Sequence, residues 1–173
     1  EVVRARRPME EPRLERALTS VPPLPPAAME GAAAVLDSAR LFRYGEHVPE
    51  GTWVARLERA FAEHFGTRFA VAVNSGGSAM FLALRSAGVE SGDVVLLNAF
   101  TLAPVPGAIE HLGAKVVLVD VDADLRVGLD DLEAAILEHR PKASLLSHMR
   151  GHVADMAGVV GLCEAHGVIL IED

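Results

Sequence analysis

The sequence predicts an α/β fold: a mostly parallel sheet with helices on both of its faces. From Thr52 onward, short runs of Val, Ile and Leu alternate with segments of helical periodicity. Strands that are almost entirely apolar are typical of parallel sheets that helices cover on both sides. Gly88, Gly113 and Gly167 each follow a helical segment, where a glycine suits the left-handed position that ends a helix.

The individual elements follow from the same alternation. We expect strands at residues 69–73, 94–98, 115–121, 143–148 and 168–173. The helices between them are expected at residues 78–87, 104–112, 129–139 and 155–166. An earlier helix carries Trp53, Leu57, Phe61 and Phe65 at helical spacing and should end at Gly66. We expect this aromatic stripe to be part of the core rather than of a cofactor site.

Residues 1–45 differ in composition and are predicted to form an N-terminal leader. The proline-rich segment 21–26 favours a stiff, extended backbone. The alanine-rich segment 27–39 favours a helix.

Composition and charge exclude several classes of protein. The chain has 173 residues and a net charge of −8, with a pI near 5.3. A nucleic-acid-binding protein would carry a basic patch, so we expect no nucleic-acid partner. No apolar run is long enough to cross a membrane and no signal peptide is visible, so we expect a cytoplasmic protein without a membrane partner. The single cysteine, Cys163, lies on an apolar helix face and is expected to be a buried thiol.

In an open α/β sheet, ligands bind outside the carboxyl ends of the strands. That rule selects residues 74–78, 98–102, 120–124, 147–152 and Asp173 as candidate site residues.

The turn at residues 74–79 is the first candidate for a binding function. It reads Asn-Ser-Gly-Gly-Ser-Ala, and it connects an apolar run to a helix. Backbone N–H groups at a helix N-terminus attract phosphate, so Gly76, Gly77 and Ser78 are candidate phosphate ligands. The segment matches neither a Walker A motif nor a dinucleotide-binding fingerprint. The alternative is a tight connection without a ligand.

Asp173 ends the last expected strand and is the second candidate. A carboxylate there can hold a cationic ring nitrogen, as the aspartate partner of pyridoxal phosphate (PLP) does. A phosphate-binding turn followed later by such an acid is the arrangement that a PLP enzyme needs. PLP chemistry also uses a lysine as Schiff base. The two lysines, Lys115 and Lys142, each stand at the start of a strand and are expected on the opposite edge of the sheet.

Two further polar clusters can be explained by structural roles in loops. His148, Arg150 and His152 follow a strand, but no clear third ligand accompanies the histidines, so we expect no metal site. These side chains either hold the loop in place, or His148 contacts the ligand. Asp120, Asp122 and Asp124 lack the spacing of a calcium loop and are expected in a solvated loop.

From about residue 45 to residue 173, the chain resembles the fold-type I PLP-dependent aminotransferases, specifically the DegT/DnrJ/EryC1/StrS family of sugar aminotransferases. The resemblance rests on six segments in matching order and spacing: residues 73–79, 92–95, 98–103, 113–120, 147–156 and 171–173. The six together are far more specific than any one of them.

The resemblance implies the large, PLP-binding domain of an aspartate aminotransferase-like fold, incomplete here. Residues 46–173 would be the N-terminal part of that domain, with the small C-terminal domain and the Schiff-base lysine absent. It implies that Gly76, Gly77 and Ser78 hold the PLP phosphate. Asp173 would bind the ring nitrogen, Leu102 would contact the ring face, and His148 would lie near the cofactor's phenolic edge or the substrate.

Two residues depart from the family's usual pattern. Gly77 stands where the family usually has threonine, so one side-chain contact to the phosphate is missing and Ser78 would compensate. Leu102 stands where an aromatic ring is usual, so plain apolar contact would replace stacking.

The function that the resemblance implies is transamination of a keto sugar, cyclitol or related carbonyl compound, with an amino acid donor. The small-molecule substrates and a homodimeric partner are implied with it. One alternative is a PLP-dependent sugar dehydratase of the same family, in which a histidine replaces the Schiff-base lysine. A second alternative, for a chain complete as it stands, is a non-catalytic binding or interaction domain.

Overall fold

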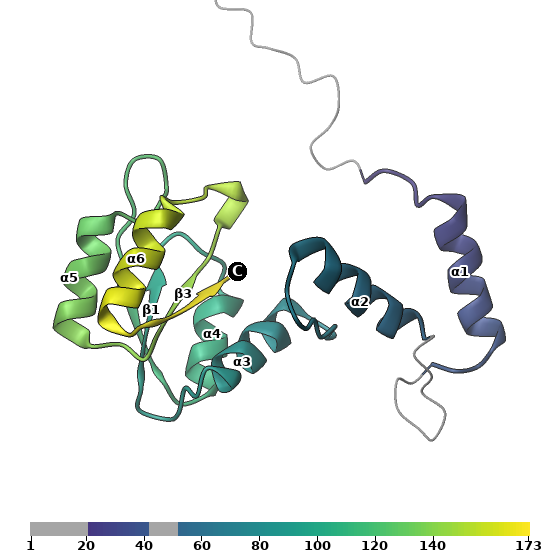
Figure 1. Ribbon diagram of the computed structural model, residues 1–173, viewed down its shortest axis with the longest axis horizontal. Coiled ribbons are helices and arrows are strands. Elements are labelled where there is room, and N and C mark those ends of the chain that lie inside the picture. The colour runs from purple at the N-terminus through teal and green to yellow at the C-terminus, as the bar shows by residue number, and fades with distance from the viewer. Residues whose placement is uncertain (1–20, 42–51) are drawn as a thin grey trace, which may run out of the picture. The chain divides into compact units, whose positions relative to one another are not determined.

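The computed structural model describes residues 21–41 and 52–173 (Figure 1). The chain divides into two compact units, Glu1–Phe61 and Ala62–Asp173. The expectations for residues 1–20 and 42–45 of the leader lie outside the described residues.

The first unit contains helix α1 (Pro26–Asp37) and most of helix α2 (Trp53–Phe65). Pro25, at φ −63° and ψ 147°, is extended as expected, and Pro26 begins α1 at a position where a missing N–H costs nothing. The Trp53 ring lies over Gly31, where an added Cβ would stand 3.3 Å from the ring. The Arg56 guanidinium lies 4.5 Å from the centre of the same ring.

The aromatic stripe of α2 is not part of a core, contrary to the prediction. No residue of α2 is buried, and the stripe is exposed at Trp53, Leu57, Phe61 and Phe65. Periodicity identifies one apolar face of a helix, but it does not tell what covers that face.

The second unit is built on a four-stranded parallel sheet in the order β2-β1-β3-β4. Its strands are β1 (Val94–Asn98), β2 (Lys115–Val119), β3 (Ala143–Leu146) and β4 (Ile169–Glu172). The bounds of β1 match the prediction, and the other three strands are shorter than predicted. The polar residues that follow each strand therefore lie just beyond its end.

Residues 69–73 do not form a strand, which corrects the prediction. The segment belongs to none of the four paired strands, and Phe69 and Val71 are 74% and 69% exposed. Its apolar residues favour β structure, but a strand forms only where a neighbouring strand pairs with its backbone.

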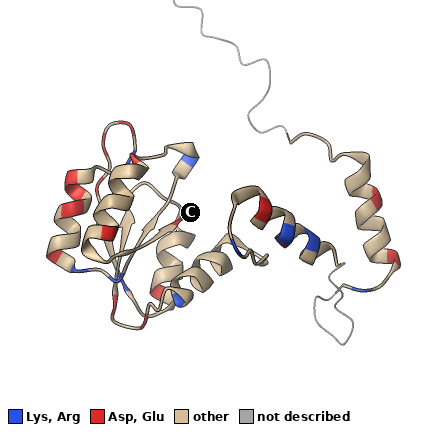
Figure 2. Ribbon diagram, in the orientation of Figure 1, with Lys and Arg blue, Asp and Glu red and all other residues tan. Residues whose placement is uncertain are grey.

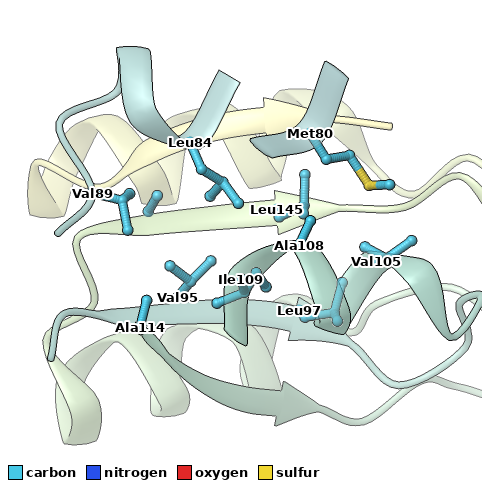
Figure 3. Packing of buried hydrophobic residues seen from close by; sticks show 11 residues of the cluster. Met80, Leu84, Val89, Val95, Leu97, Val105, Ala108, Ile109, Ala114 and Leu145 are labelled. Carbon is cyan, nitrogen blue, oxygen red and sulfur yellow. The ribbon is translucent and has the colours of Figure 1, made fainter. Parts of the chain in front are cut away.

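Helices cover both faces of the sheet, as predicted. Helices α3 (Gly76–Ser86) and α4 (Pro104–His111) share one buried cluster with Val95, Leu97 and Leu145 of the sheet (Figure 3). Helices α5 (Leu129–His139) and α6 (Met156–His166) share a second cluster with Leu96 and Leu146. Successive strand residues point to opposite faces, and this alternation divides the core into two layers.

Glycines end the helices at the predicted places. Gly66, Gly88, Gly113 and Gly167 follow α2, α3, α4 and α6 with φ between 65° and 74°. Helix α5 ends differently, on Arg140 at φ 47°.

Helices α3 and α4 begin at the edge of the sheet where the strands end. In Figure 3, Met80 and Val105, from the N-terminal halves of these helices, lie toward the arrowheads of the strands. Leu84 and Ile109, one turn further along, lie farther from the arrowheads. The start of α3 therefore belongs to the carboxyl edge of the sheet, where α/β proteins bind their ligands.

Charge is distributed unevenly over the described residues. Figure 2 shows acidic residues gathered on α5 and only scattered lysines and arginines. Within residues 21–41 and 52–173, no helix is both long and apolar enough to cross a membrane.

Candidate functional site

The turn before α3 leaves open space beside Gly76 and Gly77. The Ser75 side chain caps the helix, because its Oγ accepts a hydrogen bond from Ser78 N–H at 3.1 Å. Ser75 Oγ also lies 3.0 Å from Ser78 Oγ. A Cβ placed on Gly76 would meet nothing within 4 Å, and one on Gly77 would meet only Ser75 Oγ at 3.9 Å. The first N–H groups of a helix have no partner within the helix, so this turn offers donors and open space to an anion.

A cavity of about 690 Å³ opens beside this turn. Asn74, Ser75, Gly77 and Ser78 line it at the start of α3, and its wall continues to His111 of α4. The cavity therefore brings together two of the three predicted phosphate ligands and adds Asn74 and Ser75 to them.

The ends of β3 and β4 form a second polar group around Asp173. Asp173 N–H donates to Leu146 O at 2.8 Å, and His148 N–H donates to Asp173 O at 2.7 Å. Ser147 Oγ donates to Asp173 Oδ2 at 3.1 Å. The Asp173 main chain is thus fixed on both sides, and one carboxylate oxygen is held by a hydroxyl. Within the described residues, Oδ1 makes no hydrogen bond and is available to a ligand.

Asn98 connects this group to the central strand. Its side-chain Nδ2 donates to Ser147 O at 3.0 Å, and its Oδ1 accepts from Ser147 N–H at 2.8 Å. Nδ2 also donates to Phe100 O at 2.9 Å. Asn98 and Ser147 are only 4% and 7% exposed. A buried amide with this many partners fixes the Ser147 backbone tightly.

His148 lies next to Asp173 but binds its neighbour. Its Nε2 is 3.0 Å from Glu172 Oε2. Within residues 21–41 and 52–173, its Nδ1 is buried without a hydrogen-bond partner, and the same is true of Thr101 Oγ1 in the loop after β1. Buried polar atoms are normally hydrogen-bonded, so these two mark places where a polar ligand atom would be stabilised.

Leu102 lies in the loop between β1 and α4, and its side chain is 57% exposed. This loop contacts the loop that follows β3, since the rings of Phe100 and His152 lie edge to face with centroids 6.1 Å apart. His152 therefore contributes to holding the loop, one of the two roles considered for this cluster.

The remaining candidates take structural roles. Asp122 Oδ1 accepts hydrogen bonds from Asp124 N–H and Arg126 N–H, which closes the loop after β2. Lys115 begins β2 and Lys142 precedes β3; both are exposed at the amino edge, opposite the strand ends, as predicted. No group of three potential metal ligands occurs within residues 21–41 and 52–173. Cys163 is buried, as predicted, and burial raises the pKa of its thiol.

Three residues of this arrangement have no individual role in the sequence analysis. Asn98 and Ser147 entered only as members of candidate ranges, and Glu172 did not enter as a site residue. A buried-type strand that ends in asparagine is the one signal that points to Asn98, because an amide is stable there only with partners.

Comparison with known proteins identifies the family of this chain. The sequence profile described as the DegT/DnrJ/EryC1/StrS aminotransferase family matches residues 30–173. The chain belongs to this family. The match confirms the predicted resemblance, and it begins within the segment that composition set apart as a leader.

Named relatives of this DegT/DnrJ/EryC1/StrS chain include a cyclitol aminotransferase. The L-glutamine:2-deoxy-scyllo-inosose aminotransferase of Streptomyces fradiae is 34% identical over 149 residues, which are 86% of this chain and 35% of that protein. The chain spans about a third of the length of the curated relatives that it matches.

Solved structures of the same family confirm the predicted fold. The structure of 3-amino-5-hydroxybenzoic acid synthase superposes with a TM-score of 0.76 at 31% identity, over 89% of this chain and 39% of that one. A GDP-4-keto-6-deoxymannose-3-dehydratase with a trapped PLP–glutamate geminal diamine gives a TM-score of 0.70 at 25% identity, over 83% and 37%. The described unit is therefore part of a fold-type I, PLP-dependent architecture, and PLP is the cofactor found among its relatives.

The residues present fit PLP. The uncovered amides of Gly76 and Gly77 suit a phosphate, the free Oδ1 of Asp173 suits a protonated ring nitrogen, and His148 Nδ1 and Thr101 Oγ1 are buried polar atoms without partners.

Proposed function

We propose that the protein is a PLP-dependent aminotransferase that acts on a keto sugar, a cyclitol or a related carbonyl compound. The observation that carries the proposal is the joint presence, at one edge of the sheet, of an uncovered helix N-terminus and a fixed carboxylate. Family membership supports the reaction class, and the inosose aminotransferase relative supports the substrate class.

Each residue of the site has a definite task in this proposal. The N–H groups of Gly76 and Gly77 and the hydroxyl of Ser78 bind the phosphate and orient the cofactor. Asp173 holds the proton on the ring nitrogen through its negative charge. Leu102 contacts the ring face, and His148 lies at the phenolic edge or the substrate. Bound there, PLP supplies an electron sink for the carbon atom that loses its proton.

The proposal also concerns parts of the protein outside this chain. We place residues 46–173 as the first part of the PLP-binding domain, with the Schiff-base lysine and a small C-terminal domain supplied by the rest of the protein. Lys115 and Lys142, at the amino edge of the sheet, do not take the lysine's role. An amino acid such as glutamate or glutamine is the proposed donor, and the cytoplasm is the proposed compartment.

A sugar dehydratase is the second candidate. It is supported by the dehydratase structure that matches 83% of this chain. The two functions share the phosphate turn and the strand-end aspartate, so the residue at the Schiff-base position distinguishes them: a lysine for the aminotransferase, a histidine for the dehydratase.

The experiment that tests the proposal replaces Asp173 with asparagine in the full-length protein. Asp173→Asn keeps the shape of the side chain and removes its charge. We expect the kcat for transamination to fall by about a hundredfold or more, the size of losing one preorganised electrostatic contact. The Kd for PLP should rise much less, because the phosphate contacts remain.

Glu138→Gln is the matched control, since Glu138 is an exposed carboxylate in the last turn of α5, which leads into the start of β3 at the amino edge of the sheet. It should leave both constants unchanged. A kcat of Asp173→Asn close to that of the wild type would show that Asp173 is not the partner of the ring nitrogen.

A further inference from the structure

The carboxylate of Asp173 is oriented by one side chain. Ser147 Oγ donates to Oδ2 at 3.1 Å, and this leaves Oδ1 for a ligand. Rotation about the bond to the carboxylate would break this hydrogen bond, so the hydroxyl selects one orientation of the two oxygens.

Ser147 is in turn held by Asn98. The Asn98 side chain bonds both the N–H and the carbonyl of Ser147, and both bonds are buried. The main chain of Asn98 pairs with β2 opposite Val119, and Ala99 N–H donates to Val119 O at 2.9 Å. Beyond the ends of β1 and β3, the side-chain amide therefore takes the place of backbone pairing between them. It fixes the position of the Ser147 main chain, from which the hydroxyl extends toward Asp173.

We infer that Ser147 is a positioning residue of the PLP site, with Asn98 as its anchor. The inference rests on the proposed function. Ser147 keeps the Asp173 carboxylate aimed at the ring nitrogen, so that the nitrogen stays protonated to higher pH. Asn98 holds the Ser147 main chain at a fixed position relative to β1.

The experiment follows the proton on the ring nitrogen rather than catalytic activity. Full-length protein is loaded with PLP labelled with ¹⁵N at the ring nitrogen, and the ¹⁵N chemical shift is recorded against pH. The readout is the pH at which half of the nitrogen has lost its proton. For Ser147→Ala we expect this midpoint to fall by about one pH unit, the size of losing one hydrogen bond to a charged group. Ser147→Thr, which keeps a hydroxyl, should restore the midpoint.

Ser144→Ala provides the matched control. Ser144 is a buried serine of β3, the strand that Ser147 directly follows, and it takes no part in the bonds to Asp173. Its midpoint should equal that of the wild type, while the thermal stabilities of the two alanine variants should be similar. A midpoint that falls equally in Ser144→Ala and Ser147→Ala would overturn the inference, because it would reflect general loosening of the strand.

Asp173→Asn separates this inference from the proposed function. If Asp173→Asn lowers the midpoint and Ser147→Ala leaves it unchanged, the proposed function survives and the role of Ser147 is wrong. If the wild type fails to bind PLP, or if Asp173→Asn leaves the midpoint unchanged, both are wrong.

Discussion

The Cys163 thiol shows how burial alone sets the chemistry of a side chain. It lies in the core between α6 and the sheet. Burial disfavours the thiolate, and the pKa is therefore raised above the ordinary value of 9.0. The thiolate is the nucleophilic form, so this cysteine is a packing residue.

We predict that iodoacetamide modifies Cys163 more slowly in the native protein than in urea, since burial shields the thiol and its raised pKa lowers the thiolate fraction. Mass spectrometry of the peptide that contains Cys163 measures both rates. Equal rates would contradict the burial of this thiol. The folded state retains a proton that the unfolded chain releases above pH 9.0, so this group also lowers the free energy of unfolding as the pH rises past that value.

The positions of single residues were predictable where they depend on local sequence. Ser78 and Gly77 follow from a Gly/Ser turn that opens a helix, and Asp173 follows from an apolar strand that ends in an acid. The bonds of Ser147 were not predictable, because its partners lie 49 and 26 residues away. They meet only through the register that sets Leu97 beside Leu145 and Leu146 beside Glu172.

The tight turn between α4 and β2 requires a glycine at position 113. Its φ of 74° is unfavourable for any residue with a Cβ, and an added Cβ would stand 2.6 Å from Ser91 Oγ and 3.1 Å from Ser91 Cβ. Gly92 N–H donates to Gly113 O at 2.9 Å, so the turn cannot move away without losing this bond.

We predict that Gly113→Ala lowers the free energy of unfolding by about 2 kcal/mol or more, from backbone strain and the contact with Ser91. Gly161→Ala is the control, because Gly161 lies in the middle of α6 with nothing within 4 Å of an added Cβ. It should be neutral or raise stability by up to about 1 kcal/mol. Urea unfolding followed by circular dichroism measures both, and a neutral Gly113→Ala would contradict the strained turn.

At the scale of elements, the sequence was most informative where a segment contains the residue that ends it. The glycines after α3, α4 and α6 have the left-handed conformation that was predicted. Residues 69–73 were predicted incorrectly, because their composition favours a strand while pairing depends on a neighbour elsewhere in the fold. The prediction that the aromatic stripe of α2 is buried was wrong for a similar reason. The periodicity of the stripe is set by local sequence, but its burial depends on another surface that packs against it.

The second unit exposes several large apolar side chains, among them Phe69, Leu82 and Leu102. Exposed apolar side chains of this size often contribute to interfaces, and two-fold dimers are the commonest soluble oligomers. We predict that the full-length protein is a homodimer at micromolar concentration. Light scattering measures its mass, and a dilution series serves as the control for weak self-association. A monomeric mass over the whole series would contradict the prediction.

The strand order β2-β1-β3-β4 has a consequence for synthesis on the ribosome. Of the four strands in the described residues, β1 emerges first and is central, so β2 adds to one side of it, β3 to the other, and β4 to β3. Each new strand therefore finds a free edge, and none has to be inserted between two strands already paired. Domains tend to fold from the N-terminus as the chain is made. Asn98, Ser147 and Asp173 emerge in the same order in which they bond, so the anchor is in place before the carboxylate that it orients arrives.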